Sequence, residues 1–288
     1  MSAAPPLREA ARARLPVLRA AHPAQFRALP PSRLAVLAVL LGMGGLFALG
    51  VWRLEIDASR LLAGFGQLLH FLTLMVPPAP TQGASVEGVL RALAETLAIA
   101  FLGTLLAALI AFPLGFLAAR NATVSQVLRF LARRGLDGLR GVDALIWALI
   151  WVSVVGLGPF AGVLAIMMGD IGIFGKLYSE AIEAADRKPQ EGVVAAGGSG
   201  LHRVRFGILP EVLPVMAGQT LYFFESNVRS STIIGIVGAG GIGLVLAEMI
   251  RTLEWQAVSF IIVLILVMVA VIDLISGALR RRLIGRAS

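Results

Sequence analysis

The stretch "TLAIAFLGTLLAALIAFPLGFLAA", residues 96–119, contains no Asp, Glu, Lys or Arg. An apolar run of about 20 residues is long enough to cross the hydrocarbon core of a bilayer as a helix. Further runs without these charged residues lie at 34–52, 144–169 and 255–272. Of the 288 residues, 58% are hydrophobic and only 15% are charged, whereas a soluble domain carries about 25% charged residues. The sequence therefore predicts an all-α membrane protein that crosses the bilayer several times.

The positive charges indicate how many runs cross the membrane. Lys and Arg outnumber Asp and Glu by 25 to 17, and they gather between the apolar runs, as in cytoplasmic loops. The run at 144–169 contains "GLGP" at 156–159, where a proline would break a helix. We therefore expect two spans there, about 142–156 and 160–178. With a further span from near Val212, the prediction is six transmembrane helices with both termini cytoplasmic.

The predicted organisation has three parts. Residues 1–33 are rich in Arg and Pro, and we expect a basic, partly disordered cytoplasmic tail on the anionic leaflet. Residues 34–91 form the first transmembrane helix and a periplasmic segment. Residues 92–285 form the transmembrane core, with a cytoplasmic loop at 179–210. That loop is predicted to contain a helix, a glycine-rich turn and a second amphipathic stretch that stops at Leu209-Pro210.

The start of the loop's first helix is predicted from two residues. Pro189 suits the first turn, where its missing N–H costs nothing. Glu191 provides the negative charge that a helix N-terminus favours.

Several kinds of chemistry are excluded by missing residues. There is no cysteine, so disulfides and thiolate chemistry are impossible. The only Gly-Lys, Gly175-Lys176, is followed by Leu177 rather than Ser or Thr, so the chain has no ATP-binding P-loop. His22, His70 and His202 lack the spacing of metal ligands. The positive charge, which in a soluble protein would suggest nucleic acid, is accounted for by membrane topology.

The motif "GAGGIG" at 238–243 has the G-x-G-x-x-G spacing of a dinucleotide-binding loop. A dinucleotide site needs a βαβ unit in water, whereas this motif lies between two predicted spans. We expect a short or re-entrant segment at 230–247, on the outer side, where glycines allow a tight break and close helix packing.

Three stretches resemble the phosphonate-type permeases of bacterial ABC importers. They are "ETLAIAFLGTLLAALIAFPLGFLAARN" (95–121), "EAADRKPQEG" (183–192) and "LYFFESNVRSSTIIGIVGAGGIG" (221–243), and the resemblance extends over about 90–285. Glu191, Gly197 and Leu209-Pro210 also fall at the spacing E-A-A-x3-G-x9-I-x-L-P of the importers' coupling loop. Gly192 and Val193 replace the alanines of that motif, and Gly207 replaces its isoleucine.

The resemblance implies a multi-pass protein of the bacterial inner membrane with the type I ABC importer permease fold. It implies a homodimer with the substrate path along the dimer interface, a periplasmic substrate-binding protein, contact with membrane lipid and no nucleic acid. A separate cytoplasmic ATPase dimer would bind ATP and Mg and dock on the loop at 183–210, so this chain needs no cofactor and has no catalytic or metal site. The coupling residues would be Glu183, Glu191, Gly197, Leu209 and Pro210. The expected cargo is a phosphonate, with phosphate, phosphite or an amino acid as alternatives.

Ionisable residues inside a predicted span are the other candidate site. A charge in the bilayer centre costs roughly 2.5–3.5 kcal/mol, so it is paired or faces a cavity. Glu225 and Arg229 are four residues apart and suit an ion pair that fixes helix packing. Alternatively, Arg229 or Asn227 faces the path and helps an anion across. The predicted path or gate residues are Glu225, Asn227, Arg229, Gly238, Gly240, Gly241 and Gly243.

Three acidic residues lie close to predicted span ends. We expect Asp170 and Asp273 to be solvated at the membrane interface. Glu95, at the outer start of the second span, fits either a solvated or a functional role.

One enzyme class remains as an alternative. "GGSG" at 197–200, with His202 nearby, is similar to the motif of intramembrane serine proteases. A nucleophilic Ser199 would need a base within reach and a site that excludes water, but this serine lies in the most charged loop.

Overall fold

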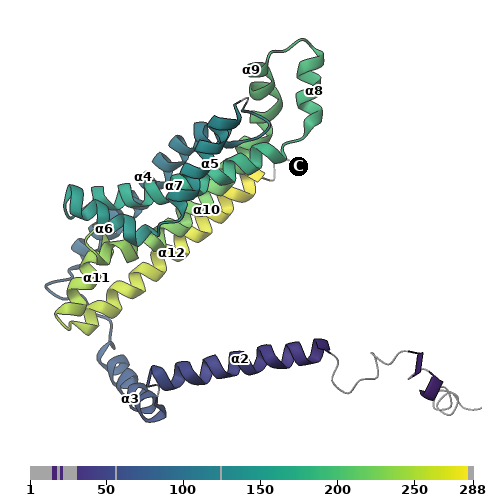
Figure 1. The fold of residues 1–288 in the computed structure, drawn as a ribbon. Helices are drawn as coiled ribbons and strands as arrows, with labels where there is room; N and C mark the ends of the chain where they lie inside the picture. The colour runs from purple at the N-terminus through teal and green to yellow at the C-terminus, as the bar shows by residue number, and fades with distance from the viewer. Residues whose placement is uncertain (1–14, 18–19, 22–30, 56, 124, 285–288) are drawn as a thin grey trace, which may run out of the picture. The chain divides into compact units, whose positions relative to one another are not determined.

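The computed structural model describes residues 15–17, 20–21, 31–55, 57–123 and 125–284 (Figure 1). The regular secondary structure of these residues is entirely helical. The chain divides into two compact units, Met1–His70 and Phe71–Ser288. Most of the predicted basic tail, residues 1–33, lies outside the described residues.

The first unit contains α2 (Pro31–Arg53) and most of α3 (Ala58–Leu74). Helix α2 matches the predicted first span at 34–52. Helix α3 lies in the segment 53–91, where the sequence analysis placed no helix. It forms because apolar residues recur at helical spacing in "LLAGFGQLLHFLTL".

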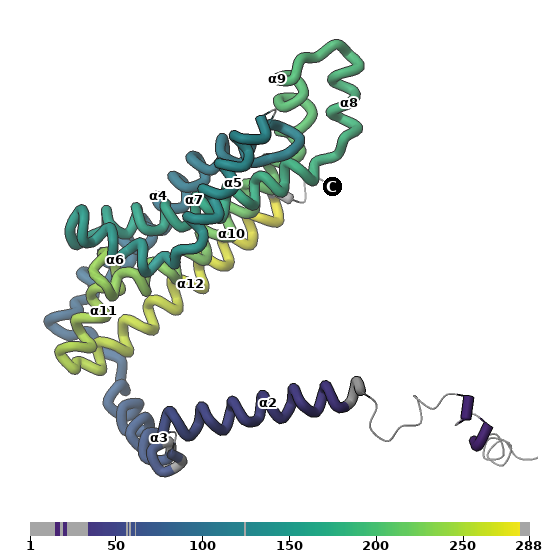
Figure 2. The backbone as a smooth tube through the Cα atoms, in the orientation of Figure 1, coloured from purple at the N-terminus to yellow at the C-terminus, as the bar shows by residue number. Residues whose placement is uncertain are grey.

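The second unit is a bundle of long helices (Figures 1 and 2). Its elements are α4 (Val86–Ala118), α5 (Gln126–Arg140), α6 (Ala144–Val155), α7 (Pro159–Ala184), α8 (Arg187–Ala195), α9 (Gly200–His202), the π-helical turn η1 (Arg203–Ile208), α10 (Leu209–Ile236), α11 (Ile242–Arg251) and α12 (Trp255–Ile284). Helices α8 and α9 project beyond one end of the bundle, and α11 lies at the other end (Figure 2).

Small residues allow the long helices to pack closely. A side chain at Gly103 of α4 would lie 2.8 Å from the Cβ of Ile166 in α7, and one at Gly115 would lie 2.8 Å from the Cβ of Tyr178. Helix contacts inside a membrane depend on such close approach, because lipid gives no hydrophobic drive between helices.

Among the residues that the structure describes, four helices are long and apolar enough to cross a membrane: 34–53, 86–118, 159–184 and 255–282. A fifth span results if α5 and α6, bent by 87°, are one broken span. Helix α10 has 28 residues, but polar side chains lower its hydropathy. The count of six spans and the cytoplasmic termini therefore stay predictions.

The predicted break in the run at 144–169 is confirmed. Helix α6 ends at Val155, and Pro159 begins α7 after Gly156 and Gly158, whose φ angles are +91° and +134°. Helix α6 rises only about 18 Å, which is less than the thickness of the hydrocarbon core of a bilayer.

The loop at 179–210 has the predicted helix, turn and second helical stretch, but three details were wrong. Helix α7 continues to Ala184, so the loop proper is shorter than predicted. Glu191 lies beyond the first turn of α8, and the helix N-terminus is instead capped by Asp186, whose carboxylate accepts the N–H of Lys188. Leu209-Pro210 does not stop the second stretch, because both residues belong to the first turn of α10, where proline is tolerated.

Candidate functional site

The glycine motif forms the turn between α10 and α11. Gly238, Gly240 and Gly241 have φ angles of +98°, +83° and +71°, a region that side chains disfavour. A Cβ at Gly240 would lie 2.7 Å from the backbone nitrogen of Pro159. A Cβ at Gly243 would overlap the carbonyl oxygen of Thr232. The motif is thus a tight break that packs against α4, α7 and α10.

The N-terminus of α11 is capped by side chains of α4. Glu95 accepts the N–H of Gly241 at 2.7 Å, and the hydroxyl of Thr96 accepts the N–H of Ile242 at 2.8 Å. A helix N-terminus favours negative charge and binds phosphate in nucleotide sites. Here the chain's own carboxylate takes that position, so the G-x-G-x-x-G spacing needs no nucleotide.

Four charged residues form a ladder between α10 and α12. Glu225 lies 2.8 Å from Arg280 and 3.9 Å from Arg229, and Arg229 lies 3.4 Å from Asp273. The predicted pair of Glu225 and Arg229 is present but is the longest of the three. The Glu225 side chain is only 15% exposed, whereas those of Arg229 and Asp273 are 46% and 42% exposed. The ladder is therefore closed around Glu225 and has its open end at Arg229 and Asp273.

Asn227 lies in the interior of the second unit. Its amide donates to the Thr104 hydroxyl at 2.8 Å and to the Asp170 carboxylate at 2.5 Å. These three buried residues join α4, α7 and α10. The expectation that Asp170 is solvated at the membrane interface was wrong, because Asp170 is 6% exposed in the middle of α7. Asp273 is half-buried and pairs with Arg229.

Helix α8 packs against η1 to form the projecting part of the loop. A Cβ at Gly207 would lie 2.9 Å from the Cα of Gln190, so glycine is needed where the coupling motif has isoleucine. Gly197 makes the turn with φ +81°. Glu191 is exposed. The apolar side chains of Val194, Leu201 and Phe206 are also exposed, as expected of a surface that binds a partner.

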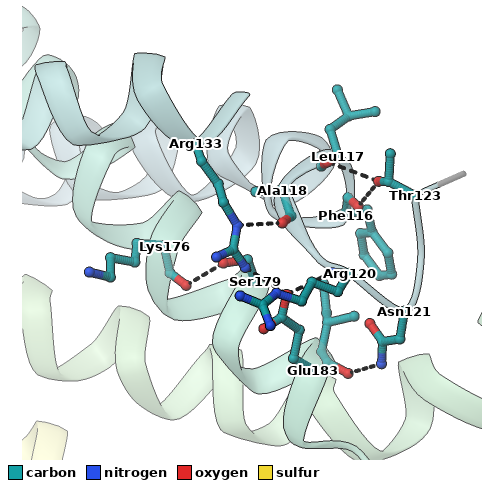
Figure 3. A network of polar contacts seen from close by, with 11 residues as sticks. Phe116, Leu117, Ala118, Arg120, Asn121, Thr123, Arg133, Lys176, Ser179 and Glu183 are labelled. Atoms are coloured by element: carbon teal, nitrogen blue, oxygen red, sulfur yellow. Dashed lines mark hydrogen bonds and ion pairs between the residues drawn. The ribbon is translucent and has the colours of Figure 1, made fainter. Parts of the chain in front are cut away.

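The base of this loop is held by a polar network (Figure 3). Glu183, near the end of α7, accepts the backbone N–H of Arg120 at 2.7 Å and pairs with Arg133 of α5 at 2.6 Å. The Asn121 amide donates to the carbonyl of Ile182 at 2.6 Å, and Arg203 of η1 donates to the carbonyl of Asn121 at 2.9 Å. Glu183 thus connects the loop to the α4–α5 link.

The loop's second attachment is at the start of α10. Glu211 accepts the N–H of Asp186 at 3.0 and 3.1 Å. The neighbouring residues Leu209 and Pro210 are half-buried and exposed, respectively.

A family model described as binding-protein-dependent transport system inner membrane component matches residues 111–285. The chain belongs to this family. With its several apolar helices, it is a multi-pass protein of the bacterial inner membrane and the permease subunit of an ABC importer.

Relatives support the same assignment. A putative phosphite transport system permease protein of Stutzerimonas stutzeri is 38% identical, over 82% of each chain. The phosphate-import permease protein PhnE of Mycolicibacterium smegmatis is 40% identical, over 80% of this chain and 43% of the relative. A putative cryptic phosphonate transport system permease protein of Escherichia coli (strain K12) is 45% identical, over 42% of this chain and 99% of the relative.

The fold is also that of a solved transporter. A chain of the MetNI methionine ABC transporter, in an inward-facing conformation, superposes with a TM-score of 0.58 at 22% identity. The match covers 68% of the chain described here and 95% of the MetNI chain. The type I ABC importer permease fold expected from the sequence is confirmed.

The protease alternative is not favoured by this family or by the local geometry. The Ser199 hydroxyl lies 3.2 Å from Nδ1 of His202, but both residues are exposed. Their contact is the capping box of α9, a local device that satisfies backbone N–H groups. Among the described residues, no group of three or more His, Asp or Glu side chains could hold a metal ion.

Sequence reasoning missed the partners of several predicted residues. Arg280, which the sequence analysis did not single out, is the nearest partner of Glu225. Thr96 and Thr104 gave no signal in an apolar run. These contacts can be identified only when it is known which faces of neighbouring helices meet.

Proposed function

We propose that the permease carries an oxyanion of phosphorus, with phosphonates as the main cargo. The names of the relatives, which cover phosphite, phosphate and phosphonate, support this class of cargo. The single observation that carries the proposal in the structure is the open end of the ladder, where the half-exposed guanidinium of Arg229 is held only by longer ion pairs.

Arg229 is the cation that meets the anion in the path. A guanidinium matches an oxyanion of phosphorus with two parallel hydrogen bonds. Its pair with Asp273 is exposed and 3.4 Å long, and exposed pairs contribute only about 0–1 kcal/mol. An anionic cargo can therefore replace Asp273 as the partner of Arg229. The buried Asn227 supports the path by fixing α10 rather than by meeting cargo.

Double replacement separates transport from packing. Arg229→Gln leaves Asp273 unpaired, whereas Arg229→Gln with Asp273→Asn removes both charges. Uptake of labelled methylphosphonate is expected to stay lost in the double variant while its thermal unfolding matches the wild type. Full uptake in the double variant would show that the pair serves packing alone.

The permease works as a homodimer with a separate ATPase dimer on its coupling loop and a periplasmic binding protein at the outer mouth. Glu183 anchors the coupling loop. Glu191 and the exposed apolar residues of the loop contact the ATPase. Gly197, Leu209 and Pro210 shape the two ends of the loop. The glycine turn at Gly238, Gly240, Gly241 and Gly243 forms the outer gate.

The cargo is identified most directly by calorimetry of the cognate binding protein with methylphosphonate, phosphite, phosphate and methionine. Tight binding of methionine alone would refute the proposed cargo.

A further inference from the structure

A crevice of about 250 Å³ lies between α4, α10 and α12. The side chains that form its walls are Phe101, Leu105, Leu221, Phe224, Ile275 and Leu279. Thr104, Thr220 and Ser276 also border it, but each hydroxyl donates to a helix carbonyl, at 2.7, 2.9 and 3.3 Å. The surface offered to an occupant is therefore apolar.

Neither an anionic cargo nor a second copy suits this crevice. Burying an anion there would cost several kcal/mol, because no donor replaces its hydration. A second copy docked on this face about a two-fold axis along the membrane normal would bring two identical basic ends of α12 together. Like charges at an interface oppose association.

The face of α12 that lines the crevice continues to a cation. Ile272, Ile275 and Leu279 border the crevice, and Arg282 follows three residues later, so all four positions share one helical stripe. The exposed Arg282 has no ion-pair partner in the described part of the chain. Arg281 points elsewhere, since its guanidinium lies 3.7 Å from the Cβ position of Gly277.

We propose that the crevice is a binding site for an anionic phospholipid, with one acyl chain between α4, α10 and α12 and the headgroup phosphate on Arg282. The long arginine side chain reaches from the apolar helix to the headgroup level, and its guanidinium binds phosphate with two hydrogen bonds.

Photo-crosslinking tests this site in the intact transporter in nanodiscs. Phosphatidylglycerol and phosphatidylcholine probes, each with a diazirine on the acyl chain, are compared by peptide mapping. The phosphatidylglycerol probe is expected to label crevice peptides about fivefold more than the phosphatidylcholine probe. This factor corresponds to the ~1 kcal/mol that one basic residue near an anionic headgroup contributes. Arg282→Gln should remove this preference, and the matched control Arg281→Gln should leave it unchanged.

A second pair of variants tests the acyl position. Ile275→Trp fills the crevice and should lower labelling by both probes, whereas Leu274→Trp, at a position 74% exposed and outside the crevice, should not. Equal labelling by the two probes, or equal loss in Arg281→Gln and Arg282→Gln, would overturn the proposal. So would a disulfide between two copies of Ile275→Cys in this cysteine-free chain, because it would place a second copy on the crevice.

Discussion

At the scale of single residues, the glycine turn shows why one motif serves two purposes. Both a nucleotide loop and this turn need positive φ and close backbone approach, and both expose the N–H groups of a helix N-terminus. The difference lies in what accepts those N–H groups. Here Glu95 and Thr96, each 146 residues before its N–H donor in the chain, are the acceptors, so the turn is fastened to α4.

Gly241→Val is expected to impair uptake. Valine at φ +71° costs about 1–3 kcal/mol of backbone strain, and its Cβ would lie 2.5 Å from the Thr96 hydroxyl. Uptake should fall roughly tenfold or more, while co-purification with the ATPase survives because the coupling loop lies at the other end of the bundle. Gly64→Val, in α3 with nothing within 4 Å, is the control. Loss of ATPase binding in Gly241→Val would show that the turn lies on the cytoplasmic side of the membrane, contrary to the prediction.

At the scale of elements, α10 connects the candidate sites. It begins at the coupling loop, carries Glu225 and Arg229 in its middle, and ends at the glycine turn. The buried bonds of Asn227 to α4 and α7, and the ladder to α12, fix its rotation. A movement of the loop that turns or shifts α10 would therefore reach Arg229 and the glycine turn together, because packed helices move as rigid elements.

Gly207→Ala is expected to weaken binding of the ATPase. The added Cβ would lie 2.9 Å from the Gln190 backbone, so α8 must move away from η1. Overpacking of this kind costs about 1–3 kcal/mol, and the affinity for the ATPase, measured by calorimetry in detergent, should fall several-fold. Gly138→Ala, on α5 with nothing within 4 Å, should bind normally. An unchanged affinity in Gly207→Ala would show that α8 and η1 separate freely.

At the scale of the whole molecule, the predicted topology places the coupling loop and both termini in the cytoplasm. The chain has no cysteine, so single cysteines can be labelled without background. In intact cells, Glu87→Cys, whose side-chain position is 87% exposed, is expected to react with a membrane-impermeant maleimide. Ser199→Cys, at the exposed loop turn, should react only after the cells are opened. Labelling of Ser199→Cys but not of Glu87→Cys in intact cells would show that the predicted orientation in the membrane is reversed.

The sequence alone determined the class of protein, the break at 156–159, the order of helix, turn and second helical stretch in the loop at 179–210, and the family. These features follow from local composition, proline and glycine positions, and motif spacing, which act over a few residues. Tertiary structure alone decided that Asp170 is buried beside Asn227, that Arg280 pairs with Glu225, and that Glu95 caps α11. Each contact depends on which faces of distant helices meet, and neither hydropathy nor spacing specifies the rotation of a helix that is apolar all round.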